Sequence, residues 1–248
     1  MSRTNTEAWI AYRRPRPQAR LRLFCFPYAG GGATVYRPWV RQMPPEIDVC
    51  PVQLPGREQR LRDRPFTRVA PLVEVLAESL APLLDEGPFA FFGHSMGATI
   101  AYELTHRLSP ERRPTHLLVS ARRAPQVPPD DEPIYDLPAA EFRAKLQEME
   151  GTPQEVLEHE ELMDLVEPLL RADFELIETY PPTEHPPLDV PITAFGGVTD
   201  SEVSREMLEA WEKVTTGPFR LRMFAGGHFY LHQQKGPLAA AVSESLLR

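Results

Sequence analysis

The chain has 248 residues, of which 42% are hydrophobic and 25% charged, and its formal net charge at pH 7 is -8. Length and composition predict one globular domain with a sizeable core, and the acidic balance argues against general nucleic-acid binding. No stretch is apolar for long enough to cross a bilayer, and the start of the sequence lacks the regions of a secretory signal. We therefore expect a cytoplasmic protein that binds neither nucleic acid nor membrane.

The cysteines and histidines predict neither a disulfide framework nor a metal centre. Cys25 and Cys50 each lie within an apolar run, so we expect two buried thiols in a reducing compartment. No cluster of Cys and His has the spacing of metal ligands.

The first third of the chain alternates between predicted strands and helices. Residues 1–20 are polar and basic, and Trp9 and Ile10 are expected to attach them to the body. Three glycines follow the first strand, and they indicate a tight turn or a close approach of two backbones. The predicted strands are 21–28 and 47–54, and the predicted helices are 34–43 and 71–84.

The stretch Phe89 to Gly97, FAFFGHSMG, carries the strongest functional signal. An apolar run enters Gly-x-Ser-x-Gly and a helical pattern follows at 96–108, which is the arrangement of a nucleophile elbow in an α/β-hydrolase. Side chains at Gly93 and Gly97 are expected to collide with neighbouring backbone, while a strained Ser95 presents its hydroxyl at a helix N-terminus. The alternative is an ordinary strand-turn-helix with an incidental serine.

The alternation is interrupted after a further strand at 115–121. Residues 124–138 are rich in Pro and Asp, residues 138–180 have helical patterns, and prolines close the segment. We expect an all-helical insertion that forms a lid over the site, although it could be only an extra packing layer. The predicted single α/β domain has core residues 1–121 and 188–248 and helical lid 122–187.

The last part of the chain returns to the α/β pattern. It predicts strands at 190–195 and 219–224 and helices at 202–214 and 237–247. The whole order of elements indicates an α/β-hydrolase fold, with a mostly parallel sheet and helices on both faces.

A serine nucleophile needs a base held in one tautomer, and in this fold the order along the chain is serine, acid, histidine. Of the seven histidines, only His228 lies on a loop between the last strand and the final helix; His232 is the second candidate. Asp200 follows the strand before, where the acid is expected, and it could also cap the helix after it. We predict a catalytic triad of Ser95, Asp200 and His228.

The negative charge that develops on the substrate oxygen requires two N–H donors. One is the backbone N–H of Met96, the residue after the nucleophile. The other is expected from the loop after the first strand, where Ala29 precedes the three glycines. We predict Met96 and Ala29 as the oxyanion hole.

Five stretches of this sequence form a recognisable set: FPYAGGG (26–32), QLPGRE (53–58), FFGHSMGA (91–98), FGG with Asp200 (195–200) and GGHFYL (226–231). Together they resemble the type II thioesterases of polyketide and nonribosomal peptide synthases. The resemblance implies a stand-alone antibiotic-biosynthesis enzyme that removes aberrant or stalled acyl groups from the phosphopantetheine arm of acyl or peptidyl carrier proteins. It also implies the same triad and oxyanion donors, a mobile helical lid over 122–185, and no metal or diffusible cofactor.

The resemblance implies an acidic partner, whereas this chain is itself acidic. Local basic patches are therefore expected to matter, either the arginine-rich run after LPGRE, at 57–68, or Arg122 and Arg123; a solvated arginine-rich surface is the alternative. We expect a monomer. The functional alternatives are a carboxylesterase, lipase-like hydrolase or acyltransferase on free esters, and a non-catalytic module that binds carrier proteins.

Overall fold

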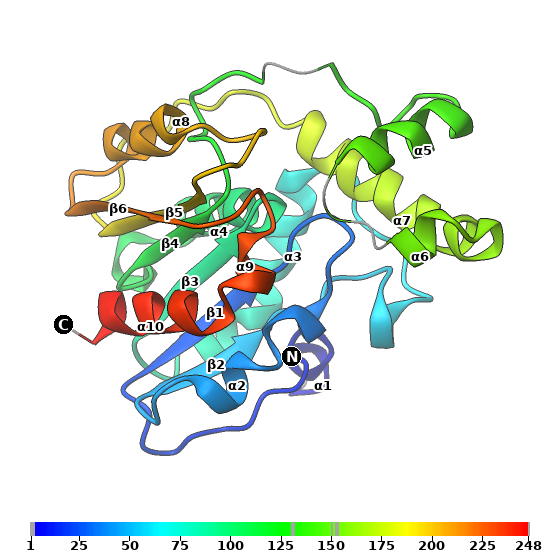
Figure 1. Ribbon diagram of the computed structural model, residues 1–248. Coiled ribbons are helices and arrows are strands. Elements are labelled where there is room, and N and C mark those ends of the chain that lie inside the picture. The colour runs from blue at the N-terminus through cyan, green and yellow to red at the C-terminus, as the bar shows by residue number, and fades with distance from the viewer. Residues whose placement is uncertain (1–2, 130–131, 150, 152–153, 248) are drawn as a thin grey trace.

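A computed structural model describes residues 3–129, 132–149, 151 and 154–247 (Figure 1). Within these ranges, six strands form one sheet in the order β2-β1-β3-β4-β5-β6, and every neighbouring pair is parallel. The predicted α/β fold with a parallel sheet is confirmed. The strands are β1 (Leu21–Phe26), β2 (Ile47–Pro51), β3 (Phe89–His94), β4 (Leu117–Ser120), β5 (Ile192–Gly197) and β6 (Phe219–Phe224).

The apolar run of β3 fits a central strand that is buried on both faces. All of its residues are buried, and alternate residues enter different cores. Phe89 and Phe91 join the cluster on one face of the sheet, whereas Ala90 and Phe92 join the cluster on the other. Period-two alternation along one strand therefore supports both cores.

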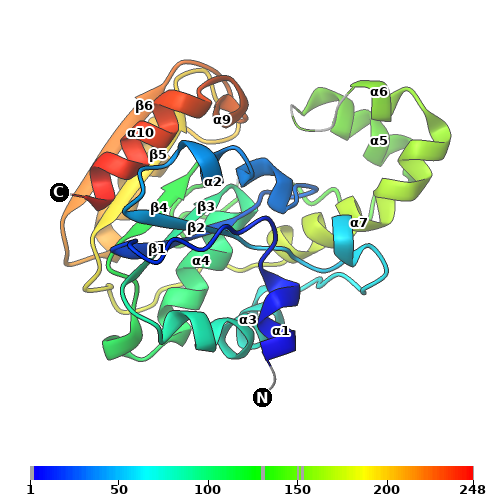
Figure 2. The same ribbon diagram turned by 90° about the horizontal axis from the view of Figure 1, so that it is seen from below.

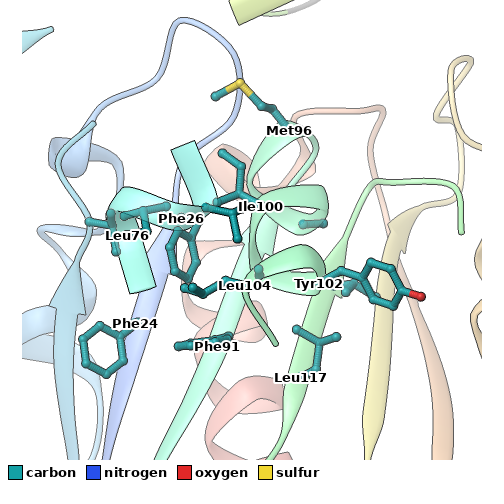
Figure 3. Close-up of a cluster of buried hydrophobic side chains, with 14 of the residues drawn as sticks. Phe24, Phe26, Leu76, Phe91, Met96, Ile100, Tyr102, Leu104 and Leu117 are labelled. Atoms are coloured by element: carbon teal, nitrogen blue, oxygen red, sulfur yellow. The ribbon is translucent and has the colours of Figure 1, made fainter. Parts of the chain in front are cut away.

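Helices cover both faces of the sheet (Figure 2). One face carries α1 (Arg3–Trp9), α3 (Val69–Leu84), α4 (Met96–Arg107) and α8 (Arg205–Glu209); the other carries α2 (Trp39–Gln42), α9 (Tyr230–Gln233) and α10 (Lys235–Leu246). In the first layer, the rings of Phe26 and Phe91 meet edge to face at 5.4 Å. Figure 3 shows part of this cluster, with Leu76 of α3 and Ile100 and Leu104 of α4.

Between β4 and β5 in the sequence, the described residues form α5 (Ala139–Glu148), α6 (Gln154–Leu157) and α7 (Glu160–Glu178). They have a small apolar cluster of their own, formed by Phe142, Leu146, Met163 and Leu170. In both ribbon views α5 and α6 lie at the periphery, away from the sheet (Figures 1 and 2). Residues 130–131, 150 and 152–153 of the predicted lid lie outside the described residues.

Two predicted helices are shorter than expected, one because of a proline and the other because of a capping serine. The segment 34–43 is a 3₁₀ turn at Ala33–Tyr36 followed by α2, because Pro38 has no N–H to continue an α-helical ladder. The segment 202–214 forms α8 followed by a 3₁₀ turn at Ala210–Val214. Helix α8 begins at Arg205 because Ser204 is its N-cap, whose side chain accepts a hydrogen bond from the Met207 N–H.

The second strand also ends before the predicted position. Beyond Pro51 one further contact with β1 remains, from the Val52 N–H to the Cys25 carbonyl. The backbone also pairs there with the N-terminal segment, because Val52 bridges Ile10 and the Gln53 N–H donates to the Trp9 carbonyl. Trp9 is 2% exposed, so the predicted attachment of the N-terminal segment is confirmed. The short helices α1 and α9 were not predicted.

Candidate active site

Ser95 occupies the turn between β3 and α4 with φ 50° and ψ −117°. A positive φ at a residue other than glycine costs roughly 1–3 kcal/mol, so the surrounding structure must impose it. A Cβ at Gly93 would overlap the Gly97 carbonyl, and a Cβ at Gly97 would overlap the Phe26 carbonyl. The predicted strain and collisions are thus present, and they hold the serine at the N-terminus of α4, where its side chain makes no capping hydrogen bond.

The loops after β5 and β6 bring Asp200 and His228 together. Gly197 and Phe224 are partners at the ends of these strands, so both loops leave the same edge of the sheet. Asp200 Oδ2 lies 3.0 Å from His228 Nδ1, and the side chains are only 1% and 6% exposed. The other carboxylate oxygen accepts hydrogen bonds from the backbone N–H groups of Glu202 and Val203. Asp200 therefore orients His228 and also caps its own turn, although α8 starts later than expected.

Opposing effects act on the pKa of His228. Burial is the largest and lowers the pKa, but the hydrogen bond to Asp200 and the charges of Glu202 and Asp200 together raise it above its usual value. Glu202 Oε2 lies 3.7 Å from His228 Nε2, the nitrogen that does not face Asp200. Sequence reasoning missed Glu202, because a second acidic residue near Asp200 on a polar loop is too common to indicate a role in the site.

Strand register also places the predicted oxyanion donors at this edge. Phe26 of β1 pairs with Gly93 of β3, so the loop that carries Ala29 and the turn before Met96 follow adjacent strands. Among the described residues, neither the Ala29 N–H nor the Met96 N–H donates a hydrogen bond within the protein. An oxyanion hole needs donors without an internal acceptor, and the assignment of these two N–H groups stays a prediction.

A buried polar network lies next to His228. The Nδ1 atom of His94 is 2.8 Å from Ser120 Oγ, which is 2.6 Å from the Tyr230 hydroxyl. The rings of His94 and His228 lie 5.5 Å apart. Burial, the largest effect, holds the pKa of His94 well below its usual value, so this imidazole is neutral. His232, the second candidate base, instead contacts the Tyr28 hydroxyl.

The arginines that were predicted to form basic surface patches differ in their exposure to solvent. Arg57 is only 4% exposed, so its assignment to a solvent-exposed basic patch is wrong. Its partner is Asp173 of α7, a contact between segments that sequence reasoning did not connect. Arg62 and Arg64 are exposed and form no ion pair with another described residue. Arg122 is partly buried, and burial lowers its pKa to about 9.

In the described part of the chain, no helix is both long and apolar enough to cross a membrane. No group of three or more His, Cys, Asp and Glu side chains within those residues is arranged to hold a metal ion. Cys25 and Cys50 are buried free thiols, as predicted.

Comparison with known proteins identifies a family. The protein-family model described as "Thioesterase domain" matches residues 21–246 of this sequence. The gramicidin S biosynthesis protein GrsT of Aneurinibacillus migulanus is 44% identical, over 92% of this chain and 89% of that protein. The type II thioesterase BorB from the borrelidin biosynthetic cluster is 36% identical, with a TM-score of 0.84 over 96% of this chain and 95% of BorB. YbtT, a type II thioesterase from the yersiniabactin NRPS/PKS pathway, is 28% identical, with a TM-score of 0.85 over 96% of this chain and 97% of YbtT.

Proposed function

This chain belongs to the thioesterase domain family, and we propose that it is an editing type II thioesterase, which hydrolyses aberrant or stalled acyl groups from the phosphopantetheine arm of acyl or peptidyl carrier proteins. The observation that carries the proposal is the contact between Asp200 and His228 at the sheet edge where Ser95 is held in a strained turn. The similarity to type II thioesterases of polyketide and peptide pathways supports the substrate class.

The proposed reaction begins at Ser95. Its hydroxyl attacks the thioester carbonyl while His228 Nε2 takes the proton, and the N–H groups of Ala29 and Met96 stabilise the oxyanion. The hydrogen bond between His228 Nδ1 and ionised Asp200 requires a proton on Nδ1, which leaves Nε2 as the base. A raised pKa makes His228 a stronger base in its neutral form.

The second half of the reaction releases the free acid. A thiol has a pKa of about 8.5, far below that of an alcohol, so the pantetheine thiol leaves with little help from an acid. His228 then activates a water molecule, which attacks the acyl group on Ser95. No step of this proposal requires a metal or a diffusible cofactor, because the pantetheine arrives on the partner.

We assign the carrier-protein contact to a small basic patch formed by Arg62 and Arg64, in place of the larger arginine surfaces predicted from the sequence. Other arginines of the same segment are engaged within the protein: Arg60 pairs with Asp63, and Arg68 pairs with Glu175. Exposed cations contribute more to the rate and orientation of encounter than to affinity. A monomeric cytoplasmic enzyme, with its thiols buried and reduced, completes the proposal.

A substrate panel tests this function against its alternatives. Release of short and long acyl groups from acyl and peptidyl carrier proteins is compared with hydrolysis of matched free esters and with transfer to an added alcohol. We expect the highest kcat/KM on carrier-bound thioesters. A preference for free esters would favour a carboxylesterase, acyl transfer without hydrolysis would favour an acyltransferase, and binding without turnover would favour a non-catalytic module.

A further inference from the structure

A buried ion pair joins α7 to two loops of the core. Asp173 of α7 and Arg57, from the loop after β2, are 1% and 4% exposed. Arg57 Nη2 donates to Asp173 Oδ1 and Nη1 donates to Oδ2, each at 2.7 Å. This two-bond geometry fixes the carboxylate against the guanidinium more tightly than a single contact does.

The same two side chains also hold the glycine loop that follows β1. The Gly30 N–H donates to Asp173 Oδ2 at 2.8 Å, and Arg57 Nη1 donates to the Gly31 carbonyl at 3.0 Å. Both contacts are to the residues directly after Ala29. The ion pair thus binds one N–H and one carbonyl of the loop. The neighbouring Ala29 N–H has no internal acceptor among the described residues.

Stability alone is a weak reason for this arrangement. Taking two charges out of water is costly, and apolar side chains of similar volume often stabilise a protein as well as a buried ion pair does. What apolar side chains cannot do is accept from the Gly30 N–H or donate to the Gly31 carbonyl. A loop with three consecutive glycines can adopt many backbone conformations. One internal hydrogen bond, from the Gly31 N–H to the Tyr28 carbonyl at 2.9 Å, closes the turn, and the ion pair adds the contacts from outside that hold this turn against the core.

We propose that Asp173 and Arg57 are positioning residues of the oxyanion hole, which fix the direction of the Ala29 N–H through Gly30 and Gly31. The proposal rests on the proposed function in one respect, the use of Ala29 as an oxyanion donor. It assigns a role to the LPGRE motif, and it makes α7 a fixed support of the site. Helix α5 is bound in turn to α7, because Arg143 of α5 pairs with Asp164 and Glu167 of α7.

The first test compares the single variant D173N with a matched control. D173N keeps the size of the side chain but turns one acceptor into a donor that faces Arg57. The control E175Q removes the ion pair between Glu175 and Arg68, which joins the same helix to the same core segment without touching the glycine loop. For D173N we expect kcat on a short acyl thioester to fall by about tenfold to a hundredfold with KM changed less than threefold; for E175Q we expect kcat within about twofold of wild type.

A second variant guards against loss of folding. The double variant R57M/D173L removes both charges and fills their volume, so it should fold even if D173N does not. Its kcat should fall as far as that of D173N, and its affinity for a trifluoromethyl ketone, which forms an oxyanion on Ser95, should fall by the same factor as kcat/KM. The acid limb of its pH profile, which reports on His228, should not move.

Three outcomes would overturn the inference. They are a folded D173N or R57M/D173L with wild-type kcat, equal losses in D173N and E175Q, and unchanged affinity for the ketone. If the wild type fails to hydrolyse thioesters, the proposed function is wrong, but the ketone adduct still decides whether Asp173 and Arg57 position an oxyanion donor.

Discussion

Replacing Glu202 by glutamine should lower the pKa of His228 and move the acid limb of the activity profile to lower pH. Catalysis needs neutral His228, so activity is lost as the pH falls through the pKa of this histidine. Burial lowers that pKa, whereas Asp200 and Glu202 raise it, with a net shift upward. E202Q removes one of the raising charges and preserves the shape of the side chain.

The distance sets the size of the effect. Two unit charges at the 3.7 Å between Glu202 Oε2 and His228 Nε2 interact by about 1 kcal/mol at the dielectric constant of water and by about 4.5 kcal/mol at an effective value of 20. The Glu202 side chain is 31% exposed, so solvent screening brings the interaction towards the lower figure. About 1 kcal/mol corresponds to a shift of roughly 0.7 pH unit.

The measurement is log kcat/KM against pH on a small acyl thioester, for the wild type, E202Q and E206Q. Glu206 is an exposed residue of α8 and is not among the charges that raise the pKa of His228, so E206Q controls for the loss of one negative charge. E202Q should shift the acid limb down by about half to one unit while E206Q leaves it in place. No shift, an upward shift, or equal shifts in both variants would refute the reasoning.

Three further changes test other parts of the site. Ser95→Ala should lower kcat on thioesters by at least about a thousandfold with the melting temperature unchanged; turnover near the wild-type rate would exclude Ser95 as nucleophile. Gly97→Ala should destabilise the fold by about 3 kcal/mol or more in urea denaturation, because its Cβ would overlap the Phe26 carbonyl; a stable variant would contradict this packing. The double variant R62E/R64E should raise KM for an acyl carrier protein about tenfold at low salt and spare a small thioester; equal loss on both would remove these residues from the docking surface.

The fold was predictable because its main signals are local. The apolar run of β3, the turn glycines and the helix that follows lie within one continuous stretch, and the same chemistry that makes them recognisable also makes them fold. Chain order then constrained Asp200 and His228, since parallel strands deliver their following loops to one edge. These two residues meet in the structure as the sequence predicted, although their catalytic roles stay predictions.

The remaining features depend on contacts that no local pattern records. Arg57 and Asp173 are 116 positions apart, and an arginine in a polar, charged segment is usually exposed. Glu202 acts on His228 only because the turn capped by Asp200 brings it back to the imidazole. The helices α1 and α9 are 7 and 4 residues long, too short for a periodic signal.

The attachment of the helical insertion has a consequence for engineering. Its ends join β4 and β5, which are neighbours in the sheet, so exchange of the insertion need not disturb the order of the strands. The apolar cluster of the insertion is separate from the two cores of the sheet, and α7 contributes Met163 and Leu170 to it. A chimera that keeps α7 with Asp173 would retain the loop anchor, and the α5 and α6 taken from a relative would have to present an apolar face that fits Met163 and Leu170. Substrate choice could then be redesigned separately from the bond-breaking machinery.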